Sequence, residues 1–324
     1  MIYKTLLETI GNTPLIRIPF PTPATILAKL EYLNPGNSLK DRSALYMIEA
    51  AEKRGDLQPG GTIIDASSGN HGISVAMIGK AKGYKVIIVV STKTSKEKLS
   101  ALYAYGAEVV VCEPTPFIDD EKSYHNVSQK LAASLPNACY LNQYYNTENR
   151  DAHYKLLGPE IWSQTAGKVT HFFAGAGTGG TVSGVGRYLK EKNPATTICA
   201  VDALTSFRAT KGNPKPYKIE GLGIDFTSEV LDYSVIDYFA EISDESAFDA
   251  LRLLVKEYGL LVGPTSGAVI AACLEKLPTF TEKDTVVLIF GDSGRAYLSK
   301  NFYLQPDNPQ DVFIPQHPQD QISL

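Results

Sequence analysis

The sequence lacks several features that would assign it to a class of protein at once. No apolar run approaches the roughly 20 residues that a helix needs to cross a bilayer. Its 31 Lys and Arg are outnumbered by 35 Asp and Glu, for a net charge of −4. We therefore expect no membrane-spanning protein and no nucleic-acid-binding protein, which usually carries a basic surface. The first 15 residues also lack the apolar core of a secretory signal, so we expect a cytoplasmic protein.

Cysteine and histidine are scarce, with four and five in 324 residues. The cysteines are spread along the chain without a CxxC pair, at Cys112, Cys139, Cys199 and Cys273. The histidines form no HExxH motif, so the sequence predicts no metal site. We predict that the cysteines are free thiols that are buried or half-buried, because free cysteine packs as a small apolar side chain.

Apolar segments that alternate with helical segments predict an α/β fold, and 44% hydrophobic residues suffice for a sizeable core. The predicted strands are 13–18, 25–31, 62–66, 85–90, 109–112, 170–175, 197–203 and 286–293. The predicted helices are 38–55, 72–83, 95–106, 123–135, 180–192, 243–259 and 263–277. For the first helix we expect Ser38 or Asn37 as the N-cap and Gly55 at the end. Because the segments form two sets, we predict two α/β domains, each with a parallel sheet and helices on both faces, and a cleft between them.

A glycine loop, Gly175 to Thr181, joins a predicted strand to a predicted helix. Small residues let backbone N–H groups approach an anion, and the helix N-terminus adds partial positive charge. No Lys-Ser or Lys-Thr pair follows, as an ATP-binding loop requires, and no acidic residue follows at the spacing of a dinucleotide site. The loop predicts a phosphate site; the alternative is a tight turn that merely needs glycine.

Lys40 lies in the first turn of a predicted helix, within NPGNSLKDR at 34–42. A surface lysine is the ordinary interpretation, yet cations are disfavoured at a helix N-terminus. A covalent role through a Schiff base would explain the position, because the imine removes the free ammonium.

The segment SSGNHG at 67–72 again follows a strand and precedes a helix. Its N–H groups and hydroxyls predict a second anion site, sized for a carboxylate. An ordinary capped turn is the alternative for this motif alone.

Taken together, these motifs resemble the cysteine synthase and cystathionine β-synthase family of fold-type-II pyridoxal-phosphate enzymes. The resemblance runs from about Thr5 to about Tyr303. The segments that carry it are GNTPL at 11–15, NPGNSLKDR at 34–42, SSGNHG at 67–72, LNQY at 141–144, GTGGT at 177–181, EGLG at 220–223, GPTSGA at 263–268 and GDS at 291–293.

The resemblance implies a role for each matching position, with pyridoxal 5′-phosphate as the cofactor. Lys40 resembles the Schiff-base lysine, and Asn70 the residue that bonds the 3′-oxygen. Thr265 matches the hydroxyl residue that faces the pyridine nitrogen. The positions that match the phosphate site are Gly177, Thr178, Gly179, Gly180 and Thr181. The positions that match the substrate site are Ser67, Ser68, Gly69, His71, Gln143 and Gly221.

Thr265 has a chemical consequence for the implied reaction. A hydroxyl does not favour a protonated pyridine nitrogen, so the ring is a weaker electron sink than it would be beside a carboxylate. Loss of a group from Cβ relieves the developing charge at once. Elimination or replacement at Cβ is therefore favoured over transamination or racemisation.

The resemblance favours replacement at Cβ of L-serine, or of an O-activated serine, by a thiol. YKIEGLGIDF at 217–226 and the stretch 281–300 look more like cystathionine β-synthase, which joins serine to homocysteine. Cysteine synthase, which uses O-acetylserine and sulfide, is an alternative. His71 stands where the synthases usually have threonine and suggests a serine dehydratase or a cysteine desulfhydrase. An inactive binding protein on this fold is a further alternative, though Lys40, Asn70 and the glycine loop are intact.

The resemblance also implies an architecture and an assembly. We expect a smaller domain at 36–148, a larger cofactor-binding domain at 1–35 and 149–310, and a tail at 311–324. The cofactor would lie in the cleft between the two domains. We expect a homodimer with small-molecule amino-acid and thiol substrates, no haem, and no response to adenosylmethionine.

Overall fold

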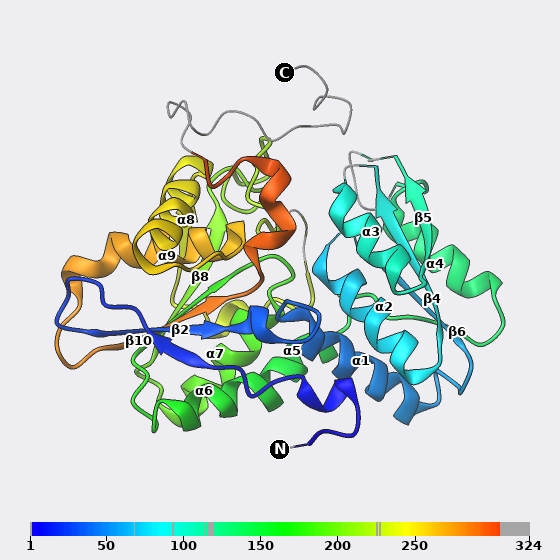
Figure 1. Cartoon of the computed structure of the whole chain (residues 1–324), viewed down its shortest axis with the longest axis horizontal. Helices are drawn as coiled ribbons and strands as arrows, with labels where there is room; N and C mark the ends of the chain where they lie inside the picture. The colour runs from blue at the N-terminus through cyan, green and yellow to red at the C-terminus, as the bar shows by residue number, and fades with distance from the viewer. Residues whose placement is uncertain are drawn as a thin grey trace, which may run out of the picture.

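The computed structural model describes residues 2–304 except for 68, 93, 114, 116–119, 225 and 227. Within this part, two separate β-sheets stand side by side, each covered by helices (Figure 1). The α/β fold predicted from the alternation of segments is therefore confirmed.

The larger sheet has six strands in the order β1-β2-β10-β7-β8-β9. Only β1 is antiparallel to its neighbour; the other pairs are parallel. Its strands are β1 (Leu15–Arg17), β2 (Thr25–Leu30), β7 (His171–Gly175), β8 (Thr197–Ala203), β9 (Tyr238–Ile242) and β10 (Thr285–Phe290). The central strand β10 is almost wholly buried, as its run of apolar residues without alternation predicts.

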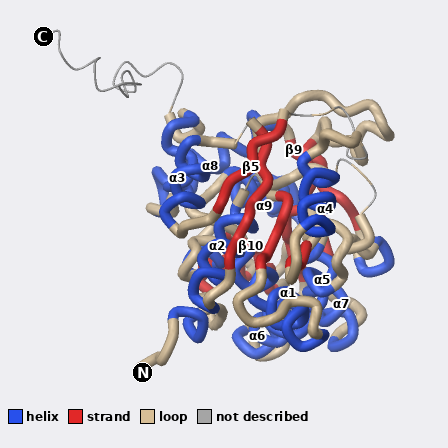
Figure 2. The backbone as a smooth tube through the Cα atoms, turned by 90° about the vertical axis from the view of Figure 1, so that its right-hand side faces the viewer, coloured by secondary structure: helices blue, strands red, loops and turns tan. Residues whose placement is uncertain are grey.

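The smaller sheet has four parallel strands in the order β5-β4-β3-β6. They are β3 (Thr62–Ala66), β4 (Lys85–Ser91), β5 (Glu108–Cys112) and β6 (Ala138–Tyr140). Figure 2 shows α4 on one side of this sheet and α2 and α3 on the other.

The helices cover both faces of each sheet, as parallel sheets require. In Figure 1, α8 and α9 lie above the larger sheet, and α6 and α7 lie below it. The α-helices are α1 (Lys40–Arg54), α2 (Asn70–Lys82), α3 (Lys96–Ala104), α4 (Tyr124–Ser134), α5 (Glu148–Ala152), α6 (Gly158–Gln164), α7 (Gly180–Lys192), α8 (Asp244–Tyr258) and α9 (Pro264–Lys276). The shorter helices are η1 (Leu6–Thr9), η2 (Glu31–Leu33), the π-helix η3 (His153–Leu157), η4 (Tyr233–Val235), η5 (Leu277–Thr279) and η6 (Gly294–Lys300).

Several details differ from the sequence prediction. β6, β9 and the run α5-η3-α6 were not predicted. The N-cap of α1 is Leu39, without a side-chain bond, so Ser38 and Asn37 were wrong as caps. Ser38 instead accepts a bond from the N–H of Lys40 at 3.3 Å. Gly55 does end α1, in the left-handed conformation with φ of 83°.

The sheets separate along the chain much as the predicted domains do, but the domain bounds themselves stay a prediction. The strands of the smaller sheet fall between residues 62 and 140. α1 and α5 contact each other where the two halves meet (Figure 1). The predicted tail at 311–324 lies outside the described residues.

The four cysteines are free thiols, as predicted, and only Cys112 is not fully buried. Among the described residues, no helix is both long and apolar enough to cross a bilayer. Nor does any group of three or more His, Cys, Asp or Glu in that part have the arrangement of a metal site.

Candidate active site

A cavity lies where four helices begin. Lys40 starts α1, Asn70 starts α2, Gly180 starts α7, and Thr265 is the second residue of α9; all four line the cavity. Each helix N-terminus contributes partial positive charge, so their convergence makes a site for anions. The complete lining is Leu39, Lys40, Asn70, Ala174, Gly175, Gly177, Thr178, Gly179, Gly180, Thr181, Gly221, Thr265, Ile289, Gly291 and Asp292.

The glycine loop follows β7 and is packed too closely for side chains. Gly179 has φ of 87°, and a Cβ there would lie 2.7 Å from Leu231. A Cβ on Gly180 would lie 2.5 Å from Oδ1 of Asn149. Within the described part of the chain, no group accepts a hydrogen bond from the N–H of Gly177, Thr178 or Gly179. These N–H groups therefore remain available to an anion.

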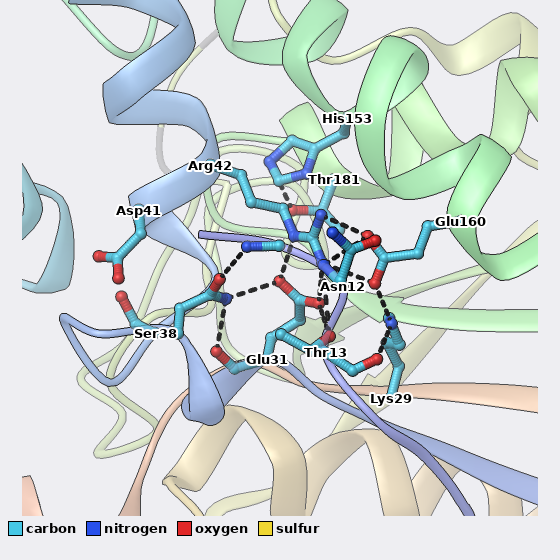
Figure 3. Close-up of polar contacts among 12 residues, drawn as sticks. Asn12, Thr13, Lys29, Glu31, Ser38, Asp41, Arg42, His153, Glu160 and Thr181 are labelled. Atoms are coloured by element: carbon cyan, nitrogen blue, oxygen red, sulfur yellow. Dashed lines mark hydrogen bonds and ion pairs between the residues drawn. The ribbon is translucent and has the colours of Figure 1, made fainter. Parts of the chain in front are cut away.

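The loop contains two threonines, Thr178 and Thr181, and both side chains are buried. Thr178 Oγ1 accepts hydrogen bonds from the N–H of Gly180 at 3.3 Å and from Nδ2 of Asn149 at 3.1 Å. Because the oxygen already accepts twice, its hydrogen is the group left to donate. Thr181 Oγ1 lies 3.3 Å from Nε2 of His153, on the π-helix η3. Figure 3 shows the side chains of Thr181 and His153 pointing toward each other.

Lys40 is held at the cavity by the backbone that directly follows β10. The N–H of Leu39 bonds to the carbonyl of Gly291 at 2.8 Å, and Ser38 forms a β-bridge with Asp292. Burial lowers the pKa of Lys40 to about 8, against the opposing effect of the Asp292 charge. A lysine with such a pKa has a larger neutral, nucleophilic fraction near neutral pH than a surface lysine.

The residues after Lys40 anchor α1 in the protein. The Asp41 carboxylate accepts bonds from the N–H of Gly36 at 2.6 Å and from the Ser74 hydroxyl at 2.5 Å. The Arg42 guanidinium is buried and bonds to Glu31 at 2.7 Å and to Glu160 at 2.8 Å.

Lys29 also forms an ion pair with Glu160 (Figure 3). The positive charges of Lys29 and Arg42 thus balance the negative charges of Glu31 and Glu160 inside the protein. This network ties α1 to β2, η2 and α6 and so fixes where Lys40 lies.

The Asn70 side chain faces the buried carboxylate of Asp292. Its Nδ2 donates to Oδ2 of Asp292 at 2.7 Å, and the Tyr297 hydroxyl donates to the same oxygen at 2.5 Å. Burial raises the pKa of Asp292, while the bonds from Tyr297 and Asn70 oppose that shift.

Thr265 lines the same cavity from the first turn of α9. Its hydroxyl donates to the carbonyl of Glu220 at 3.0 Å. A Cβ on Gly175 would lie 2.4 Å from Cγ2 of Thr265, so only glycine fits there. Gly221 has φ of 90° and packs against the Thr265 hydroxyl, which explains the second glycine.

Of the described residues that were predicted to bind the substrate, only Gly221 lines the cavity. Ser67 Oγ accepts a bond from the N–H of Gly72 at 2.9 Å and so acts as a local cap of α2. Gly69 is the N-cap of α2, and a Cβ there would meet nothing within 4 Å. Gln143 is buried and donates to the carbonyl of Ala66 at 3.3 Å. Ser68 lies outside the described residues.

The His71 side chain lies away from the cavity lining, and the role of this residue in substrate binding stays a prediction. Its imidazole does not line the cavity: it is buried, with Nε2 2.8 Å from Oδ2 of the equally buried Asp65. The ring points into the smaller half because β3 places a carboxylate there. The side chain therefore offers nothing to a ligand in the cavity, and only the backbone N–H of His71 remains at the first turn of α2.

Three residues near the cavity had no role in the sequence prediction. Asp292 was noted only as part of GDS, and His153 and Asn149 carried no signal. The π-helix that holds His153 is a feature often found at functional sites, but it has no mark in a sequence. A further contact, the ion pair of Lys98 on α3 with Glu220, joins the two halves beside Tyr297.

The model of a family described as "Pyridoxal-phosphate dependent enzyme" matches residues 6–292. The chain belongs to this family. Its cofactor is thus pyridoxal phosphate, and the predicted cofactor is confirmed. The resemblance drawn from the motifs is confirmed as well, since curated relatives include both cystathionine β-synthases and cysteine synthases.

Three pyridoxal-phosphate enzymes illustrate the similarity. Cystathionine beta-synthase of Apis mellifera is 42% identical over 308 residues, which cover 92% of this chain and 61% of that protein. Cysteine synthase B of Pseudomonas aeruginosa is 38% identical, covering 93% of this chain and 98% of that protein. The crystal structure of O-acetylserine dependent cystathionine beta-synthase from Helicobacter pylori superposes with a TM-score of 0.85 at 39% identity. The match covers 94% of this chain and 100% of that one. The chain spans about three fifths of the honeybee protein's length.

The residues at the cavity fit this cofactor. Free backbone N–H groups, the Thr178 hydroxyl and the N-terminus of α7 suit a phosphate dianion. A lysine with a pKa of about 8 suits reaction with an aldehyde. Asn70 and Thr265 supply polar groups at two further edges of the same cavity.

Proposed function

We propose that the protein replaces the Cβ substituent of L-serine, or of an O-activated serine, with a thiol, and that its reaction is that of a cystathionine β-synthase. The observation that supports this most is the convergence of four helix N-termini on Lys40 and Thr265 in one cavity. The names of the curated relatives support the same reaction class.

Several polar groups at the cavity each take a part in this proposal. Bound pyridoxal phosphate supplies a conjugated ring that acidifies the Cα–H bond of an attached amino acid and so allows the Cβ substituent to leave. The Lys40 amine takes the proton from Cα and returns it after the thiol has added. The glycine loop with Thr178 and Thr181 holds the phosphate, and Asn70 bonds the cofactor's 3′-oxygen. The N-terminus of α2, from Gly69, receives the substrate carboxylate.

The bonds that change are those at Cβ of the serine. Its C–O bond breaks and a C–S bond to homocysteine forms, and the thiol proton leaves with the hydroxyl as water. Thr265 supports this course because its side chain is a neutral hydroxyl, which carries no negative charge to keep a pyridine nitrogen protonated.

Cysteine synthase is the second candidate, and the Pseudomonas aeruginosa relative favours it because it matches over nearly its full length. Elimination without replacement loses its main support, because the His71 ring that suggested it does not line the cavity.

A product assay by mass spectrometry tests the proposal. The holoenzyme is offered L-serine or O-acetylserine, each with homocysteine or sulfide, and pyruvate is measured in parallel. We expect cystathionine from serine and homocysteine, and none from the Lys40→Ala protein. Cysteine without cystathionine would assign the protein to the cysteine synthases instead. Pyruvate as the main product under saturating thiol would contradict β-replacement.

We also propose a homodimer. Ile2, Tyr3 and Leu6 lie together near the N-terminus and expose 98%, 47% and 50% of their surface, and a second copy of the chain would cover such an apolar segment. Sedimentation at micromolar concentration tests this: a species of twice the chain mass is expected, and a monomer would contradict it.

A further inference from the structure

Asp292 is a buried carboxylate without a cationic partner. It follows β10, is 5% exposed, and lines the cavity together with Lys40 and Asn70. Among the described residues, no Lys or Arg nitrogen lies within ion-pair distance of it. Since a buried carboxylate that lacks a counter-ion is costly, its presence at the cavity calls for a functional reason.

The position of this carboxylate is fixed from several sides. Oδ2 accepts from Asn70 Nδ2 and from the hydroxyl of Tyr297, which is itself buried. Oδ1 has no hydrogen-bond partner among the described residues, and a Cβ on Gly263 would lie 2.0 Å from it. The bridge to Ser38 holds the backbone. The carboxylate therefore has one orientation, with its bonded oxygen toward Asn70.

An ionised carboxylate can only accept hydrogen bonds, and this determines how Asn70 must lie. The two ends of an Asn amide are nearly equal in shape but opposite in hydrogen bonding, so an Asn is oriented by its partners. With Asp292 beside it, Asn70 must turn Nδ2 rather than Oδ1 toward the carboxylate. Nδ2 carries a second hydrogen, and both residues line the cavity.

We propose that Asp292 is a positioning residue that locks the Asn70 amide as a hydrogen-bond donor toward the cavity, and so selects an anionic oxygen on the bound ligand. The ligand is the phenolate-type oxygen of the cofactor ring. This rests on the cofactor lying in this cavity, but not on which thiol reacts. Burial raises the pKa of Asp292, and the bonds from Tyr297 and Asn70 counter it, which agrees with those donors being needed to keep the group ionised.

A double-mutant cycle tests the proposal. Pyridoxal phosphate is titrated into four apoproteins, the wild type, Asp292→Asn, Asn70→Ala and the double variant, and affinity is followed by the absorption of the bound cofactor. Loss of one hydrogen bond to a charged group should weaken binding about tenfold in each single variant. In the double variant we expect no further loss, because Asp292 acts only through Asn70.

Matched variants separate this effect from a loss of folding. Asp202 is equally buried but bonds to Ser206 and Arg208 and does not line the cavity, so Asp202→Asn should keep the cofactor affinity even if it melts earlier. Tyr297→Phe, which removes the other donor to Asp292, should shift the absorption maximum of the bound cofactor in the same direction as Asp292→Asn. Full affinity in Asp292→Asn, or losses that multiply in the double variant, would overturn the proposal. A wild-type apoprotein that binds no pyridoxal phosphate would contradict the proposed function itself.

Discussion

His153 Nε2 lies 3.3 Å from the hydroxyl oxygen of Thr181, and both side chains are buried beside the glycine loop (Figure 3). Burial holds the pKa of His153 well below its usual range, and the charges of Lys40 and Arg42 add to that effect. The ring is therefore neutral. If Nε2 carries its hydrogen, it donates to Thr181 and leaves the threonine hydroxyl free to donate to a phosphate.

Removing the Thr181 hydroxyl should weaken cofactor binding. Thr181→Val keeps the shape of the side chain but loses a hydrogen bond to a charged group, a cost of about 1.5–3 kcal/mol. Titration of the apoprotein should give a dissociation constant about ten- to a hundredfold higher. Thr165→Val is the matched control, because that buried hydroxyl bonds to the Ile161 carbonyl and lies outside the cavity. Equal affinity in the two variants would contradict the assignment of Thr181.

The glycine loop itself is a poorer place for such a test. A Cβ on Gly179 would meet Leu231 and force a side chain into a left-handed conformation, so Gly179→Val would strain the fold whether or not a phosphate binds there.

Replacing Lys40 should stabilise the protein without cofactor. Burial lowers the pKa of Lys40 to about 8 in the folded state, whereas an unfolded lysine titrates near 10.5. The folded state thus binds the Lys40 proton less tightly than the unfolded state does. The resulting destabilisation of the fold is fully present below pH 8 and is lost as the pH rises toward 10.5. In urea unfolding at pH 7, the free energy of unfolding of apo Lys40→Met should be higher than that of the apo wild type by on the order of 1–3 kcal/mol.

The advantage of Lys40→Met should shrink between pH 8 and 10.5. Lys80→Met, at an exposed position on α2, should show no such dependence on pH. A variant that is less stable than the wild type at pH 7 would contradict the account of Lys40.

The buried network around Arg42 should be worth far more than a surface ion pair. Arg42→Met would leave the buried carboxylates of Glu31 and Glu160 with less positive charge beside them (Figure 3). The free energy of unfolding in urea should therefore fall by about 3–5 kcal/mol. Arg187→Met breaks an exposed pair with Glu191 and should cost less than about 1 kcal/mol. Equal effects of the two substitutions would show that the network is not what anchors α1.

Much of the fold could be predicted because buried strands and capped helices leave clear marks in a sequence. The segment 197–203 was predicted as a strand and is β8, since burial on both faces demands an unbroken apolar run. The α5-η3-α6 run has no such mark, because a π-turn and Pro159 interrupt its periodicity. β6 has only three residues, too few for a pattern.

The candidate site divides in the same way. Lys40, Asn70, Thr265 and the glycine loop belong to local motifs, and the structure brings them to one cavity. Asp292 acquires its importance from a contact with Asn70, which lies 222 residues away, so no local pattern could reveal it.

The orientation of the His71 ring could not be predicted from its motif. Its motif resembles a ligand-binding one, but the ring is turned by Asp65 on the neighbouring strand.

The most direct test of the account is to find where the cofactor is attached. The holoenzyme is treated with borohydride, which makes a lysine–cofactor linkage stable to digestion, and its peptides are mapped by mass spectrometry. The account predicts a phosphopyridoxyl group on Lys40 alone among the 324 residues, and none in Lys40→Ala. The same group on another lysine, or a protein that takes up no pyridoxal phosphate, would contradict it.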